Sequence, residues 1–431
     1  MRRVLRPDRL VKTASGILER CLFMTILDIL ATLLVLSALL GALNHFVFGL
    51  PNTIGLVVMG LAASLAVLTL DWLAPGLGLG AAARPLLASI DFRGLLLDGF
   101  LSALLFAGAL HVDLAELVEK RWAVGLLATI GVLISVAVVG SGIWAAAWVF
   151  GAGLPLIWAL VFGALISPTD PVAVLAMLKT VRVPPSLHAK IAAEALFNDG
   201  VGIVVFTIIF AVAMGNGGAA SALAAGQLFI VQALGGAVLG LAAGWLANAL
   251  MVRLDEHTIE VMVTLALVAA TYAIALHLHV SGPIAVVVAG VLIGNHGAKT
   301  GVIEFWDLVE ELLNAVLFLL IGLEVLVIGR GFEGIGLALA AIPIVLAARY
   351  LGVAIPVALL GRWTTFSRGA VPILAWAGLR GGISVALALA LPEGPYKGVI
   401  LTATYAAVVF SIVVQGLTMP RLVLRYYPES T

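Results

Sequence analysis

The amino-acid sequence predicts an all-α protein that crosses a membrane many times. Hydrophobic residues make up 63% of the 431 residues and charged residues only 11%, a balance that soluble globular proteins of this size do not show. Apolar runs of about 17–25 residues, the length that an α-helix needs to cross a bilayer, recur from residue 22 to the end. No segment between them is long enough for a separate soluble domain, so we expect a single membrane domain over residues 1–431.

Breaks at glycine, proline and charged clusters divide this domain into about thirteen spans. We expect spans at residues 22–45, 52–74, 94–112, 121–150, 154–179, 187–214, 225–252, 258–279, 282–295, 303–329, 335–361, 368–392 and 397–420. The ninth span is short and begins at Gly282-Pro283, so it could be tilted, partial or re-entrant. The region 75–93, which is rich in Gly, Ala and Leu, could lie at the membrane interface.

Basic residues between the spans predict the orientation in the membrane. In this arrangement of spans they fall on one side, which is cytoplasmic by the positive-inside rule, and the carboxyl terminus lies there too. These residues are Lys120, Arg121, Lys179, Arg182, Lys190, Arg362, Arg368, Arg421 and Arg425. The basic amino-terminal tail, residues 2–12, falls on the opposite side, so either one span is miscounted or the tail is an exception to the rule.

Several functional classes lack their usual signatures in this sequence. It has no nucleotide-binding glycine loop and no HExxH, GxSxG or CxxC motif, which argues against ATP-driven transport and against hydrolase or metalloprotease chemistry. The formal net charge is zero and no basic patch carries interleaved aromatics, so no nucleic-acid partner is predicted. We expect no enzyme activity and no cofactor, and an ion gradient as the energy source.

Two aspartates, Asp170 and Asp199, are the most informative charged residues. They lie in an apolar stretch, 161–214, that is long enough to cross a bilayer twice. An aspartate at the centre of a spanning helix costs about 2.5–3.5 kcal/mol on insertion scales, so such carboxylates usually belong to an ion pathway or a proton relay. A carboxylate that is paired for structural reasons is the alternative.

Asp170 lies in the run Ser167-Pro168-Thr169-Asp170-Pro171, where two prolines interrupt the helix. The prolines lack N–H donors and free carbonyl oxygens of the preceding turn, and Thr169 and Asp170 add further oxygens beside them. Oxygen ligands in that arrangement suit a hard monovalent cation. A proline kink that serves helix packing alone is the alternative.

Asp199 follows two other polar residues of the next span. Helical spacing puts Glu194 and Asn198 on one face, and Asp199 is turned by about 100° from Asn198. A buried carboxylate such as Asp199 can hold a proton or a metal cation but rarely both, and this mutual exclusion is the physical basis of exchange. Asn198 is neutral and can hold a carboxylate or the broken helix in place without adding a second charge.

A second break at residues 378–382 has Arg380 at its centre, 210 positions after Asp170 (380 − 170). An odd number of expected spans separates the two breaks, so the two interrupted spans would run in opposite directions across the membrane. Paired broken helices in corresponding positions of two halves are typical of inverted-repeat secondary transporters.

Two arginines in apolar surroundings, Arg349 and Arg380, need partners inside the membrane. We expect Glu194 and Arg349 to form a structural ion pair. Arg380 would then supply a positive charge near the helix crossing, or it would neutralise the helix ends that face it.

At these residues the chain resembles the NhaP/NHE-type monovalent cation:proton antiporters, the sodium/hydrogen exchangers. Residues 167–174 resemble the family's fifth-helix motif, and Phe197-Asn198-Asp199-Gly200 resembles its sixth-helix Asn-Asp motif. Further similarity lies at residues 280–286, 314–324, 348–349 and 376–384, so that the match runs from about residue 22 to residue 420.

The resemblance implies the sodium/proton antiporter fold: inverted repeats with two crossed broken helices, in a homodimer of a multi-pass cell (cytoplasmic) membrane protein. It implies a dimerisation subdomain at 22–115 and 222–330 and a core ion-transport subdomain at 120–214 and 335–420. The core would move like an elevator and exchange a monovalent cation for H⁺ by alternating access, contributing to pH and cation homeostasis. Na⁺ is the first expectation, with K⁺ and Li⁺ left open.

The resemblance also implies roles for individual residues. Asp199 would be the main ligand of the cation and the proton, Asp170 and Thr169 would assist, and Asn198 would organise the site. The only metal implied is the transported alkali cation, held by Asp199 and Asp170. Members with the Asn-Asp motif generally exchange one cation for one proton electroneutrally.

Two positions depart from the family pattern. Ala107 stands where many members have a carboxylate on the third helix, and Ala195 stands where many have a serine after the glutamate of the sixth helix. Both positions supply cation-coordinating oxygens in family members, so cation selectivity does not follow from the resemblance. A gated cation channel without proton coupling is the alternative function, and an intramembrane hydrolase with an aspartate pair is a more remote one.

Overall fold

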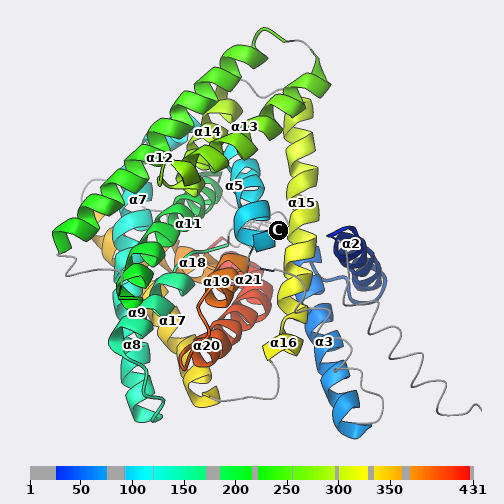
Figure 1. Ribbon diagram of the computed structural model, residues 1–431, viewed down its shortest axis with the longest axis vertical. Helices are drawn as coiled ribbons and strands as arrows, with labels where there is room; N and C mark the ends of the chain where they lie inside the picture. The colour runs from blue at the N-terminus through cyan, green and yellow to red at the C-terminus, as the bar shows by residue number, and fades with distance from the viewer. Residues whose placement is uncertain are drawn as a thin grey trace, which may run out of the picture. The chain divides into compact units, whose positions relative to one another are not determined.

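The structure is a computed structural model. It describes residues 26–74, 92, 94–119, 121–170, 185–215, 222–254, 256–296, 300–328, 334–361 and 369–427. Within these ranges every regular element is a helix (Figure 1). This agrees with the all-α class that the hydropathy of the sequence predicts.

The helices follow the predicted spans closely. In the first half of the chain they are α2 (Ile26–Leu43), η1 (Asn44–Phe48), α3 (Asn52–Leu73), η3 (Gly94–Phe100), α5 (Leu101–Leu110), α6 (Leu114–Glu119), α7 (Arg121–Leu126), η4 (Leu127–Gly131), α8 (Val132–Val149), α9 (Leu156–Ile166) and α11 (Pro185–Ala213). Those labelled η are π-helical segments, and most of them continue directly into an α-helix.

The described residues of the second half of the chain also form helices. Its helices are α12 (Ala222–Met251), α13 (His257–His277), α14 (Gly282–His296), α15 (Thr300–Leu323), α16 (Val325–Ile328), α17 (Ile335–Leu360), α18 (Ala370–Ala377), α19 (Gly382–Leu389), α20 (Lys397–Phe410), η5 (Ser411–Gln415) and α21 (Gly416–Tyr426). Helix α6 was not predicted, and the last helix runs six residues beyond the predicted end at 420 (426 − 420).

Eight helices in the described part of the chain are long and apolar enough to cross a membrane, and a ninth span forms if the bent pair α18 and α19 is counted as one. Three shorter apolar helices are Gly94–Leu110, Leu156–Ile166 and Gly282–His296. The structure therefore establishes a polytopic α-helical membrane protein, whereas the count of about thirteen spans stays a prediction. The predicted interfacial region, 75–93, lies almost entirely outside the described residues.

Helix α14 corresponds to the short ninth span. It is one continuous helix of 15 residues, about 22 Å long at 1.5 Å per residue, which is shorter than the hydrocarbon core of about 30 Å. It packs against α12, α5 and α13, and nine of its residues are buried. Protein thus surrounds this short helix, and within Gly282–His296 it has no re-entrant break.

The chain forms two compact units. One comprises residues 1–91 and 315–329, and the other comprises residues 92–314 and 330–431. In the first unit, Leu319, Leu323 and Leu326 pack against apolar side chains of α2 and α3, and the Ser64 hydroxyl donates a hydrogen bond to the Gly322 carbonyl at 3.0 Å. The predicted division into a dimerisation and a core subdomain stays a prediction.

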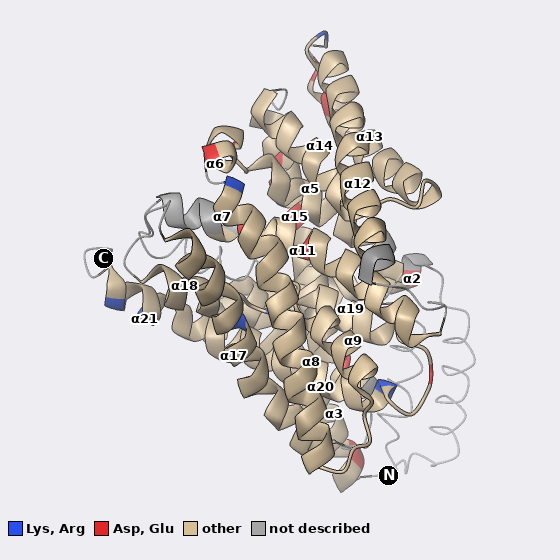
Figure 2. Cartoon of the chain, turned by 90° about the vertical axis from the view of Figure 1, so that its left-hand side faces the viewer, with Lys and Arg blue, Asp and Glu red and all other residues tan. Residues whose placement is uncertain are grey.

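The second unit holds all the predicted site residues. In it α8 packs on α9 and α17, α9 packs on α11, and α20 packs on α17 and α19. Figure 2 shows that charged residues lie mostly at helix ends and connections, while the long helical faces carry few of them. Exposed side chains such as Val238 and Trp245 on α12 suit contact with lipid, where apolar surface carries no penalty.

Candidate functional site

The first predicted break follows the end of α9. This helix ends at Ile166, and residues 167–170 are non-helical, as the prolines in this run predict. Ser167 closes the last turn, because its hydroxyl donates to the Gly163 carbonyl at 2.7 Å. Ser167 and Thr169 are buried, whereas Pro171 and the segment after it lie outside the described residues.

The second predicted break is confirmed between α18 and α19, which end and begin at Ala377 and Gly382 and are bent by 45°. The two breaks meet, because the Asp170 N–H donates to the Leu379 carbonyl at 2.8 Å. The Asp170 carboxylate lies so close to Gly381 that a Cβ there would overlap it. Segments about half a chain apart in sequence thus form one site.

Arg380 joins the second break to the first. Its guanidinium is buried and donates to the carbonyl oxygens of Ser167 and Pro168, while its backbone N–H donates to the Ser411 hydroxyl at 2.9 Å. Arg380 therefore binds carbonyls at the carboxyl-terminal end of α9, where the helix dipole places negative charge. Of the two roles predicted for Arg380, this geometry matches neutralisation of a helix end.

Helix α11 brings Asn198 and Asp199 to the first break. An Asp199 carboxylate oxygen accepts the Thr169 N–H at 3.1 Å, and the Asn198 amide donates to the Thr169 hydroxyl at 2.9 Å and to the Ser167 carbonyl at 3.3 Å. Asn198 and Asp199 are only 1% and 4% exposed. The neutral Asn198 thus fastens the broken segment beside the carboxylate.

Asp199 is a buried carboxylate with little compensating charge. The charges of Asp170 and Glu194 repel it, and Arg380 attracts it. The side-chain amide oxygen of Asn198 is buried and has no hydrogen-bond partner among the described residues. A proton or a hard monovalent cation suits this site, where the oxygens of Asp199 and Thr169 lie near the unpaired side-chain oxygen of Asn198. The positive charge of either ion would relieve the repulsion between the carboxylates.

Glu194 and Arg349 form a bidentate ion pair, and Glu194 lies one helical turn before Asn198 on α11. The guanidinium donates to the two carboxylate oxygens at 2.7 and 2.6 Å and to the Leu374 carbonyl at 3.1 Å. The side chains are 3% and 8% exposed, and Gly378 lies so close to the guanidinium that a Cβ there would overlap it. This pair ties α11 to α17 and to the end of α18.

A sequence model of the family described as "Sodium/hydrogen exchanger, transmembrane" matches residues 33–425. The chain belongs to this family. A Na⁺/H⁺ antiporter, NhaP of Pseudomonas aeruginosa, is 44% identical over 413 residues, which cover 93% of this chain and 97% of that protein. A second relative, the Na⁺/H⁺ antiporter NhaH of Halobacillus dabanensis, is 34% identical over 387 residues, covering 86% of this chain and 91% of that protein.

A solved structure shares the fold of this exchanger-family chain. The sodium proton antiporter MjNhaP1 of Methanocaldococcus jannaschii, determined at pH 8, superposes with a TM-score of 0.71 at 21% sequence identity. The match covers 96% of this chain and 99% of that structure. The antiporter fold that the resemblance implies is therefore confirmed.

The two positions that depart from the exchanger-family pattern are both buried. Ala107 is 0% exposed and lies in an apolar cluster with Phe106 and Trp306, and Ala195 is 3% exposed beside Glu194 on α11. Neither side chain offers an oxygen. Any cation held by Asp199 therefore draws its other ligands from the remaining side chains, from carbonyls or from water.

Ser411 and Ser167 are site residues that the sequence did not predict. Ser411 begins the π-helical segment η5 and fixes the backbone of Arg380, while Ser167 offers its carbonyl to both Arg380 and Asn198. The only sequence signal for Ser411 is a small polar residue in an apolar run, and such residues also occur for helix packing alone.

A Gly381→Ala substitution should disturb the position of Asp170. The added methyl group would overlap the carboxylate, and overpacking of this kind typically costs about 1–3 kcal/mol. We expect weaker apparent cation affinity in a vesicle assay that follows a pH-sensitive dye. Gly398→Ala on α20 is the matched control, because a Cβ there would have no neighbour within 4 Å. Equal affinities in the two variants would show that the close approach of Gly381 does not matter.

Proposed function

We propose that this protein is a Na⁺/H⁺ antiporter, a secondary active transporter that works by alternating access. The observation that carries the proposal is the buried Asp199 carboxylate beside a broken helix, repelled by Asp170 and fastened by neutral Asn198. The names of the relatives NhaP and NhaH as Na⁺/H⁺ antiporters support it. The alternative of a channel without proton coupling finds no support in these relatives.

In the proposed mechanism Asp199 holds either a proton or the transported cation. A protonated Asp199 lowers the repulsion from Asp170 and leaves no charge to attract Na⁺, whereas an ionised Asp199 supplies the negative ligand that Na⁺ needs. Because one carboxylate serves both ions, each crossing of the cation requires the departure of a proton. Asp170, Thr169 and Asn198 supply or position further oxygens.

Arg380 and the pair Glu194–Arg349 support the site without binding the transported ions. Arg380 holds the carbonyls of Ser167 and Pro168 in place, and Arg349 neutralises Glu194. Arg349 thereby offsets the negative charge that Glu194 adds near Asp199.

We further propose that the protein is a homodimer in the cytoplasmic membrane and contributes to pH and cation homeostasis. The resemblance supports a dimerisation subdomain at 22–115 and 222–330 and a moving core at 120–214 and 335–420. Alternating access in such transporters is largely rigid-body movement of one part against the other around a fixed site.

A vesicle assay tests the proposed exchange. Vesicles with an acid interior quench a pH-sensitive dye, and addition of Na⁺ should restore the fluorescence as protons leave. The same measurement with Li⁺, K⁺ and Rb⁺ ranks the cations, which Ala107 and Ala195 leave undecided. Na⁺ uptake without recovery of the dye signal would indicate a channel and would contradict the proposal.

An Asn198→Asp variant should make exchange sensitive to membrane potential. A second carboxylate beside Asp199 adds a negative charge at the site, so more than one proton would balance each cation and net charge would move in every cycle. We expect an imposed potassium-diffusion potential to change the exchange rate of the variant and to leave that of the wild type unchanged. A variant that exchanges at a rate independent of the potential would contradict this role for Asn198.

A further inference from the structure

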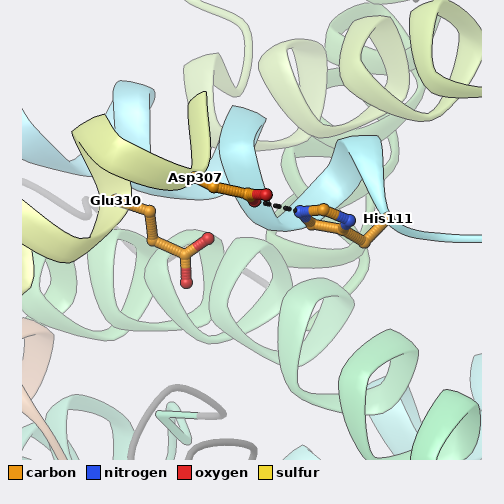
Figure 3. Close-up of side chains that lie close together, drawn as sticks. All are labelled: His111, Asp307 and Glu310. Atoms are coloured by element: carbon orange, nitrogen blue, oxygen red, sulfur yellow. Dashed lines mark hydrogen bonds and ion pairs between the residues drawn. The ribbon is translucent and has the colours of Figure 1, made fainter. Parts of the chain in front are cut away.

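A histidine and two carboxylates gather away from the exchange site, in the same compact unit. His111 follows the end of α5, and Asp307 and Glu310 lie three positions apart on α15, so both carboxylates share one face of that helix. His111 Nε2 and an Asp307 carboxylate oxygen are 2.7 Å apart. One ligand atom from each of the three residues lies within 4.8 Å of the others (Figure 3).

The α15 side of this cluster is anchored by packing. Trp306, next to Asp307, is 1% exposed and its ring lies 4.8 Å from that of Phe106 on α5, measured between centroids. The Trp306 indole N–H also donates to the Thr264 hydroxyl at 2.9 Å. This contact fixes α15 against α5 just beside the three ligands.

The α5 side is anchored by hydrogen bonds to the end of α14. The Asn295 side chain donates to the Val112 carbonyl at 2.8 Å and accepts the Leu114 N–H at 2.9 Å. The backbone that follows His111 is therefore held in position, and helix α5 precedes it. Ligands with anchored backbones need only side-chain rotation to close on an ion, which keeps the cost of binding low.

The chemistry of the cluster selects a class of ion. Two carboxylates provide two negative charges for a divalent cation, and an imidazole nitrogen favours Zn²⁺, Cu²⁺, Fe²⁺ or Ni²⁺ over Mg²⁺ and Ca²⁺. Zn²⁺ bonds of about 2.0–2.2 Å place tetrahedral ligand atoms about 3.3–3.6 Å apart, a spacing within the range of the cluster. The side chains of His111 and Asp307 are 48% and 49% exposed, so ions and water reach them.

We propose that His111, Asp307 and Glu310 bind one divalent transition-metal ion of the Zn²⁺ class, which bridges α5 and α15. This site is separate from Asp199 and does not take the transported monovalent cation. His111 lies ten positions before the basic residue Arg121, with the short helix α6 between them. The positive-inside rule therefore places the site on the cytoplasmic side.

Direct metal binding to the full-length, tag-free protein in detergent tests the site. After treatment with a chelator, the wild type is titrated with Zn²⁺ alone and with Mg²⁺ alone by calorimetry. The His111→Gln and Asp307→Asn variants should each bind one Zn²⁺ fewer per chain, or bind that ion at least about 100-fold more weakly. Mg²⁺ should not compete for it.

His296→Gln is the matched control, because His296 ends the neighbouring helix α14 and its ring nitrogen lies 3.2 Å from the Leu292 carbonyl of its own helix. It should bind Zn²⁺ as the wild type does. If His111→Gln does not fold, Glu310→Gln takes its place, and Co²⁺ absorption bands report nitrogen and oxygen ligands in the wild type.

Two results would overturn the proposal. One is that the wild type binds no Zn²⁺ up to about 1 mM. The other is that the cluster variants and His296→Gln all bind as much Zn²⁺ as the wild type. Neither readout uses exchange activity, so the outcome is independent of the proposed function.

Discussion

The Asp199→Asn variant should show no cation-dependent proton movement. Asparagine has the shape of aspartate, but its amide side chain does not bind and release a proton, and it offers no negative charge to a cation in a buried site. The hydrogen bond from the Thr169 N–H to the side-chain oxygen can persist, so the fold should survive the change. In proteoliposomes with a pH-sensitive dye, the variant should give the signal of protein-free vesicles for every alkali cation.

Glu304→Gln is the control for this loss. Glu304 is an exposed carboxylate on α15, so its neutralisation removes one negative charge away from the exchange site. We expect exchange at the wild-type rate in this variant. Normal exchange by Asp199→Asn, in protein shown to be folded and inserted, would contradict the assignment of Asp199 as the shared ligand.

The second large effect concerns the ion pair between Glu194 and Arg349. Removing one partner of a buried pair leaves an uncompensated charge and typically costs about 3–5 kcal/mol. Both Glu194→Gln and Arg349→Met should therefore lower the melting temperature of the protein in detergent. The double variant should be more stable than either single variant, because no charge then remains buried alone.

An exposed pair provides the comparison for the buried one. Lys397 donates to Glu393 at 2.7 Å, and the Glu393 side chain is 90% exposed, so solvent screens the interaction. The Glu393→Gln variant should melt close to the wild type. Additive losses in the Glu194 and Arg349 variants would mean that the two residues do not act as a pair.

The sequence predicts the fold well because membrane burial constrains it strongly. Apolar runs locate the helices, and the clusters of proline at residues 167–171 and of glycine at residues 378–382 locate both breaks. Single prolines are a weaker signal, because Pro343 and Pro356 lie inside the continuous helix α17. Asp170, Asp199 and Asn198 stand out because polar groups are costly at membrane depth. Helix ends are harder to predict, because hydropathy marks apolar runs rather than the ends of helices, and α21 continues past the predicted end at residue 420 to Tyr426.

The partners of the polar groups could not be predicted in the same way. Arg380 binds the carbonyls of Ser167 and Pro168, and every residue has a carbonyl, so no residue type marks these acceptors. The Ser411 hydroxyl reaches the Arg380 backbone only because α20 and η5 fold back beside α19. The contact between His111 and Asp307 could not be predicted from the sequence either, because 196 positions separate the two residues.

Proton release on cation binding tests the central claim most directly. Na⁺ is added to the detergent-solubilised protein in a weakly buffered solution near the pH at which exchange is half-maximal, and the pH is followed. If Asp199 holds either a proton or a cation, the wild type should release up to about one proton per chain, and Asp199→Asn should release none. Saturable Na⁺ binding without proton release by the wild type, or equal release by both proteins, would contradict competition at Asp199.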